Sequence, residues 1–236
     1  MSSSRPARRP SRRTPRGPAA ATLAAVAALA LLGGCANSPG EVPPTGVDEL
    51  TVPTPSPDPG DFVDTVDNAW FPLERGTVQR WRVLGGPGGG VRVVVAEQPR
   101  VVAGVPATVV RSRGTDDPEA GRDGWSTALH SDFFAQDREG NVWWLGRAGE
   151  WEAGVDGAQA GLAVPADPRV GDGYRMALLE GVVEDRAEVT AVDDDVVRLE
   201  VFGDDATREV VLERGVGPTR IEKGYDEVLE RLTDPA

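Results

Sequence analysis

His130 is the only histidine in the chain, which makes it the first residue to consider for acid–base or metal chemistry. Asp132 follows two positions later, so on a strand both side chains lie on one face and suit an acid–base pair or two ligands of a metal ion. A lone histidine cannot supply the several imidazole ligands of a His-based zinc cluster or of a His-Glu-x-x-His metalloprotease. We therefore interpret His130 as a strand histidine that is hydrogen-bonded to a nearby carboxylate.

A second candidate is Asp137-x-Glu139-x-Asn141, in which oxygen-bearing side chains recur at alternate positions as they do in calcium loops. The next residues, 142–145, are apolar, so the bidentate glutamate that completes a calcium loop is missing. The segment is better interpreted as the turn of a β-hairpin.

Signatures of the common enzyme classes are also missing: the sequence has no Gly-x-Ser-x-Gly, phosphate-loop or Gly-x-Gly-x-x-Gly motif. We predict no catalytic residue, no metal and no cofactor. Paired carboxylates of a carbohydrate hydrolase stay an alternative, because 38 acidic residues are spread along the chain.

Four of the six tryptophans lie between residues 125 and 151. With one phenylalanine they form the set that we consider for a ligand pocket: Trp125, Phe134, Trp143, Trp144 and Trp151. Core packing is one interpretation of the set, and a mostly apolar pocket for an acyl chain or a sugar ring is the other. Trp143 and Trp144 are consecutive, so on a strand they point to opposite faces of the sheet. Either both faces are covered, or one tryptophan packs in the core while the other lines a pocket, and we expect the second arrangement.

The elements that would position these residues follow a period of two, which is typical of β-strands. Two aromatic pairs, at 133–134 and 143–144, flank a polar turn and predict a central hairpin of Trp125–Gln136 and Val142–Arg147. Further strands are expected over Thr77–Leu84, Val91–Glu97, Val105–Arg111, Tyr174–Leu179, Glu184–Val192, Val196–Phe202, Thr207–Leu212, Val216–Lys223 and Tyr225–Leu232.

The fold class that follows is all-β: a single antiparallel, strongly curved sheet, either a half-open barrel or sandwich-like, with long loops. Gly114–Gly124 is expected to be a surface loop. Gly149–Val170 has no convincing period and is expected to be an ordered loop that packs across the sheet. A short helix over Glu227–Leu232 is an alternative to the last strand, because its apolar residues also share helical spacing.

The N-terminal residues are predicted to form an export signal. Residues 1–18 contain six arginines and no acidic residue, and Ala19–Leu32 is an apolar run. This run is shorter than the roughly 20 residues that cross a bilayer, and the two parts together are typical of a secretory signal peptide. Leu32-Gly33-Gly34-Cys35 then resembles the lipobox of bacterial lipoproteins. The resemblance implies that the signal peptide 1–34 is cleaved and that acyl chains on Cys35, the only cysteine, hold the protein on the extracytoplasmic face of the cell membrane.

Residues 36–60 contain seven prolines, which predicts a semi-extended tether. The lipidated Cys35 and this tether together form the segment 35–60. A single β domain is expected over 61–236. Without the six N-terminal arginines the chain keeps 19 basic against 38 acidic residues, a net charge of −19. This charge argues against nucleic acid as a partner and against electrostatic adhesion to anionic lipid. A single lysine among many arginines indicates a GC-rich genome such as that of an actinobacterium. Export by the Sec or the twin-arginine route stays open.

Four motifs carry a further resemblance: Asn68-Ala-Trp-Phe-Pro-Leu-x-x-Gly-Thr77, Ala135-Gln-Asp-x-x-Gly-Asn-Val-Trp-Trp144, Trp151-Glu-Ala-Gly-Val-x-Gly-Ala158 and Gly215-Val-Gly217. With these the chain resembles a group of uncharacterised, actinobacterial-type secreted lipoproteins over nearly the whole domain. The departures are a longer loop at Gly114–Gly124 and the presence of His130. The resemblance implies a secreted antiparallel β fold and no established activity.

Three classes of function follow from these patterns. We expect a membrane-anchored envelope lipoprotein that is not an enzyme and binds an amphiphile or another envelope component, so that a lipid, a glycan or an envelope protein is its partner. A structural or protein-interaction module is the second class, and a carbohydrate-active hydrolase is the third. A carrier needs an apolar cavity, an interaction module a filled core, and a hydrolase convergent titratable groups.

Overall fold

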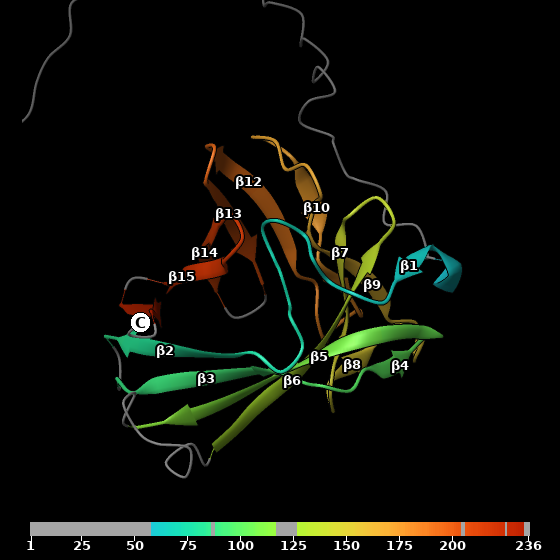
Figure 1. The fold of residues 1–236 in the computed structure, drawn as a ribbon, viewed down its shortest axis with the longest axis horizontal. Coiled ribbons are helices and arrows are strands. Elements are labelled where there is room, and N and C mark those ends of the chain that lie inside the picture. Colours follow the sequence, from blue (N-terminus) through green and yellow to red (C-terminus); the bar gives the residue numbers. More distant parts are fainter. Residues whose placement is uncertain (1–57, 86–87, 117–126, 204–205, 225, 234–236) are drawn as a thin grey trace, which may run out of the picture. The chain divides into compact units, whose positions relative to one another are not determined.

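A computed structural model describes residues 58–85, 88–116, 127–203, 206–224 and 226–233. It is all-β (Figure 1): the described residues contain one short 3-10 helix, η1 (Pro59–Asp61), and no α-helix. The strands are β1 (Phe62–Val63), β2 (Val78–Leu84), β3 (Gly90–Val95), β4 (Arg100–Val102), β5 (Val105–Thr115), β6 (Thr127–Asp137), β7 (Val142–Arg147), β8 (Trp151–Glu152), β9 (Gln159–Val164), β10 (Gly173–Arg175), β11 (Ala177–Leu178), β12 (Arg186–Val192), β13 (Val196–Phe202), β14 (Thr207–Glu213), β15 (Gly217–Lys223) and β16 (Glu227–Leu232). None of the described helices has the length and apolarity that crossing a membrane requires.

One antiparallel sheet contains all these strands. Its order is β10-β12-β13-β14-β15-β16-β2-β3-β5-β6-β7-β9-β11, and β1, β4 and β8 pair beside this path. Most neighbours are joined by hairpins, and the pairing of β16 with β2 brings the end of the domain to its beginning. The single, strongly curved antiparallel sheet predicted from the sequence is confirmed.

The sheet nearly closes into a barrel, with one seam. Its two end strands, β10 and β11, are separated in the chain by Met176 alone, although they pair with β12 and β9 respectively. Across the seam the hydroxyl of Tyr174 donates to the carbonyl of Ala163 at 3.3 Å. Gly161 on β9 lies under this crossing: a Cβ there would stand 2.3 Å from the carbonyl oxygen of Arg175. A side chain at position 161 would therefore hold the seam open.

Buried clusters lie on both faces of the central hairpin β6–β7. Trp143 belongs to one cluster, with Phe133 and Leu145, and its ring meets that of Phe62 edge-on at 6.3 Å. Trp144 belongs to the other, and its ring meets that of Trp151 at 5.0 Å. Both Trp143 and Trp144 are only 6% exposed. The sheet is thus covered on both sides here, which is the arrangement that we had not expected.

Two details of the sequence-based assignment are wrong. Gly149–Val170 is not a loop but contains β8 and β9, although it does pack onto the sheet, with Trp151, Leu162 and Val164 buried. The alternative C-terminal helix is absent, because β16 pairs with both β15 and β2. The predicted loop 114–124 begins inside β5, and its later part lies outside the described residues.

Candidate functional site

The residues of two sequence motifs meet in one hydrogen-bond network that fastens the segment before β2 to the central hairpin. The side chain of Asn68 accepts from the backbone N–H groups of Trp70 and Phe71, at 2.8 and 3.1 Å. Its amide donates to the carbonyls of Gly140 and Pro165, at 2.8 and 3.3 Å. Gln136 on β6 in turn accepts from the backbone N–H of Asn68 at 2.7 Å. These residues therefore have an evident structural role.

Asp137 is the centre of the hairpin turn. One carboxylate oxygen accepts from the backbone N–H groups of Glu139 and Asn141, at 3.0 and 2.9 Å. The other accepts from the side chains of Asn141 and Trp143, at 2.9 and 2.8 Å. A carboxylate has about four acceptor positions, so these four bonds use its capacity. The turn interpretation is confirmed, and no group of acidic, histidine or cysteine residues suited to a metal occurs in the described part of the chain.

His130 and Asp132 do share one region, as their spacing predicts. Nε2 of His130 lies 3.2 Å from one oxygen of Asp132, while Nε of Arg147 donates to the other oxygen at 2.8 Å. Burial is the largest cause that lowers the pKa of His130, and the nearby carboxylate of Asp132 opposes it. The guanidinium of Arg147 also lies 5.1 Å from the ring of Trp144. The carboxylate thus holds Arg147 against the buried indole, which is a packing role.

The predicted pocket residues are scattered over two packed clusters. Trp143, Trp144 and Trp151 are buried, and Phe134 is half-buried against Phe71, with ring centroids 5.2 Å apart. Trp125 lies outside the described residues. The indole N–H of Trp151 is buried and has no hydrogen-bond partner among the described residues. A ligand pocket formed by this set stays a prediction.

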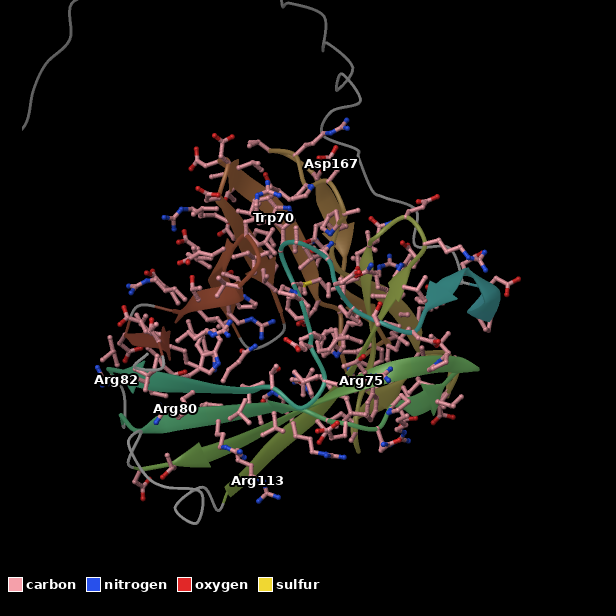
Figure 2. All side chains as sticks on the ribbon, viewed as in Figure 1. Trp70, Arg75, Arg80, Arg82, Arg113 and Asp167 are labelled. Carbon is pink, nitrogen blue, oxygen red and sulfur yellow. The ribbon has the colours of Figure 1, made fainter. Side chains whose placement is uncertain are left out.

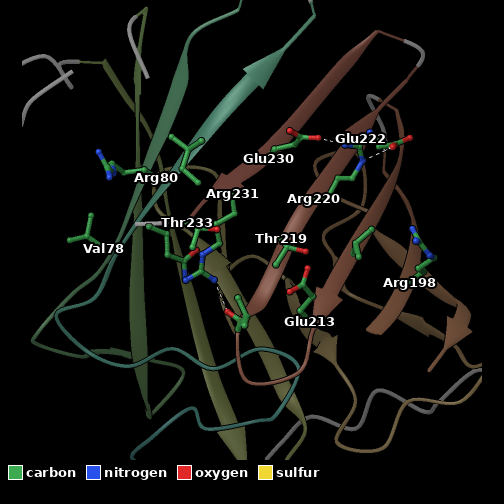
Figure 3. Close-up of a pocket in the computed structure, with 14 residues that line it drawn as sticks. Val78, Arg80, Arg198, Glu213, Thr219, Arg220, Glu222, Glu230, Arg231 and Thr233 are labelled. Carbon is green, nitrogen blue, oxygen red and sulfur yellow. Dashed lines mark hydrogen bonds and ion pairs between the residues drawn. The ribbon is translucent and has the colours of Figure 1, made fainter. Parts of the chain in front are cut away.

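The candidate site that the structure adds is a groove of about 800 Å³ elsewhere on the sheet (Figure 3). It lies on the polar side of β13–β16 and β2, and Figure 3 shows Thr219 in the midst of the charged side chains. Its lining residues are Val78, Gln79, Arg80, Arg198, Val211, Glu213, Val216, Thr219, Arg220, Glu222, Glu230, Arg231, Leu232 and Thr233. None of the predicted pocket residues is among them, and the lining contains no aromatic ring.

Ion pairs organise the groove. Arg220 on β15 donates to Glu222 at 2.8 Å and also pairs with Glu230 on β16. The hydrogen bond to Glu222 is the main cause that raises the pKa of Arg220, so the guanidinium stays charged. Arg198 donates to Glu209 at 2.9 Å. The walls therefore present fixed donors and acceptors to solvent rather than an apolar surface.

Sequence reasoning missed this groove, although a signal was present. Charged residues recur in each of β13–β16, which on its own is the usual composition of a sheet face that meets solvent. The groove forms because the curved sheet brings β13 and β2, four strand pairings apart, to its opposite walls. That curvature cannot be read from a charge pattern.

Comparisons of the chain with protein-family models, with curated proteins and with solved structures gave no match.

Proposed function

We propose that this chain is a lipid-anchored lipoprotein of the bacterial cell envelope whose β domain binds a polar envelope polymer, without catalysing a reaction, in the groove between β2 and β13. The groove, with its arginine and glutamate side chains, is the observation that supports the proposal most. Acyl chains on Cys35 and the tether 36–60 would keep the domain near such a polymer.

The packing around the tryptophans is the reason for preferring a polar ligand to an acyl chain. A lipid carrier needs a largely apolar cavity, whereas the groove is lined by four arginines, three glutamates and two threonines among its fourteen residues. Both faces of the central hairpin are filled by side chains. We therefore consider an amphiphile, the ligand expected from the sequence, a weaker candidate than a glycan or another polar polymer.

The hydrolase alternative gains little from the groove. Glu222 and Glu230, two of the three glutamates that line it, both bind the same guanidinium, that of Arg220. Glycoside hydrolysis needs one carboxyl group to donate a proton while the other acts as nucleophile or base. A shared arginine gives the two carboxylates the same role instead of two different ones.

Filling the groove tests the proposal. With insoluble cell wall prepared from the bacterium that encodes the protein, the natural protein should sediment, whereas Thr219→Trp should stay in the supernatant because the indole occupies the middle of the groove. Glu213→Trp, on the exposed end of β14, should act in the same way without changing β15. The measurement is the sedimented fraction, with a thermal melt of each variant to confirm folding.

The matched control is Val182→Trp, which adds the same indole at an exposed turn outside the groove and should sediment like the natural protein. Equal sedimentation of all three variants would refute binding in the groove. Failure of the natural protein itself to sediment would refute an insoluble wall polymer as the ligand.

A further inference from the structure

Three adjacent strands, β2, β3 and β5, contain five arginines and no aspartate or glutamate. The five are Arg80, Arg82, Arg92, Arg111 and Arg113. The chain as a whole has 38 acidic against 25 basic residues, so a stretch of sheet without any acidic residue is a marked local exception.

The strand register places these arginines together. Arg80 lies directly opposite Arg92, and Arg92 lies directly opposite Arg113, so the three form a row across three strands. Residues opposite each other in antiparallel strands share a face, and alternate residues of one strand do too. Arg82 and Arg111 therefore lie on the same face as the row, and we call the five residues the arginine row.

The arginine row faces solvent. Arg82, Arg111 and Arg113 are exposed, and Arg80 and Arg92 are half-buried. Figure 2 shows Arg80, Arg82 and Arg113 projecting from this part of the sheet. Arg80 and Arg82 have interaction partners of their own. Within the described part of the chain, no ion pair or hydrogen bond involves the guanidinium of Arg92, Arg111 or Arg113.

This arrangement does not serve the fold. Like charges directly opposite each other destabilise a strand pair. The neighbouring strands show what a stabilising pattern looks like, since Arg220 and Arg198 are each paired with glutamates. Arg92, Arg111 and Arg113 have no such neutralising partner among the described residues, and Arg92 and Arg113 lie directly opposite each other, which indicates a surface that meets negative charge in a partner.

We propose that the arginine row binds a linear anionic polymer, one that carries phosphate or carboxylate groups along its length, and that this polymer continues into the groove; the inference rests on the proposed function and names its ligand class. Neighbouring arginines stand about 5 Å apart across the strands and about 7 Å apart along them. Guanidinium groups bind phosphate and carboxylate by paired hydrogen bonds, so this spacing suits closely repeated charges.

Continuity with the groove favours a flexible polymer over a flat anionic membrane. Arg80 belongs both to the arginine row and to the groove lining, together with its strand neighbour Val78. A chain can follow the surface from the row into a concave site, whereas a bilayer surface cannot enter it. Negative charge outside the row and the groove does not prevent this contact, because charges farther away than about 8 Å are largely screened at physiological ionic strength. Within the groove, Glu222 and Glu230 are paired with Arg220.

The test uses protein purified in detergent from its own membrane and linear inorganic polyphosphate as the probe, followed by calorimetry at several salt concentrations. The variant Arg92→Ala with Arg113→Ala removes two charges without touching the groove lining. Its affinity should fall about tenfold or more, and the slope of log affinity against log salt should become shallower by roughly 0.7–0.9 for each arginine removed. Arg138→Ala with Arg169→Ala, two arginines on exposed turns, is the matched control and should bind like the natural protein.

Equal binding by the two double variants would overturn the inference, and so would tighter binding to phosphatidylglycerol vesicles than to polyphosphate. The outcome is separable from that of the groove experiment. If Thr219→Trp abolishes sedimentation with cell wall but the Arg92/Arg113 variant binds polyphosphate normally, the groove function stands and the anionic ligand class is wrong. If Thr219→Trp sediments like the natural protein but the Arg92/Arg113 variant loses polyphosphate binding, the row binds anions and the groove is not the site.

Discussion

Replacing either Trp143 or Trp144 with alanine is expected to lower the free energy of unfolding by about 3–5 kcal/mol, the usual cost of truncating a large buried aromatic side chain. The structural reason is that each indole fills a separate cluster, one on each face of the hairpin β6–β7. Each also donates a hydrogen bond, Trp143 to Asp137 at 2.8 Å and Trp144 to the carbonyl of Gly146 at 2.9 Å. Chemical denaturation of the two variants measures the effect.

The control is Val155→Ala, in a turn where the side chain is 52% exposed, and its effect should stay within about 0.5 kcal/mol. A severe loss in one tryptophan variant and a small loss in the other would contradict the two-sided packing. It would restore the earlier expectation that one face of the hairpin lines a pocket.

The second large effect concerns Asn68, whose side chain makes four hydrogen bonds to backbone groups while only 6% exposed. Asn68→Ala should cost about 3 kcal/mol, because it removes these bonds and leaves buried partners without a replacement. The same denaturation measurement applies.

Arg75→Ala is the comparison for Asn68→Ala, since it removes a single exposed hydrogen bond to the carbonyl of Asp64 and should cost under about 1 kcal/mol. If both variants lose the same small amount, the network around Asn68 does not hold the segment before β2 to the hairpin. The motif around Asn68 would then need an explanation other than structure.

Local pattern was enough to predict most of the strands, because apolar residues alternate clearly in segments such as β13, where Val197, Leu199 and Val201 are buried. It failed at β9, where alanine and glycine replace larger apolar residues and blur the alternation. Gly161 in this strand is required because the backbone of Arg175, distant in the sequence, lies too close for a side chain at position 161. Tertiary requirements of this kind leave no periodic trace in the sequence.

The candidate site could be predicted less well for a related reason. The tryptophans were the most conspicuous side chains, but consecutive positions on a strand say only that two faces are used, not what covers each. The groove and the arginine row depend on register, which places Arg80, Arg92 and Arg113 side by side although 33 positions separate the first from the last. Charge in a strand becomes informative only when its cross-strand neighbours are known.

Native mass spectrometry of the protein purified from its own membrane tests the central claim most directly, because it weighs the covalent lipid and any retained ligand together. The expected species begins at Cys35, carries the acyl chains of a lipoprotein, and holds no further lipid, since both faces of the hairpin are filled and the groove is polar. A stoichiometric, non-covalent lipid that disappears in Trp144→Ala would contradict the account, and it would place a lipid-binding pocket at the tryptophans.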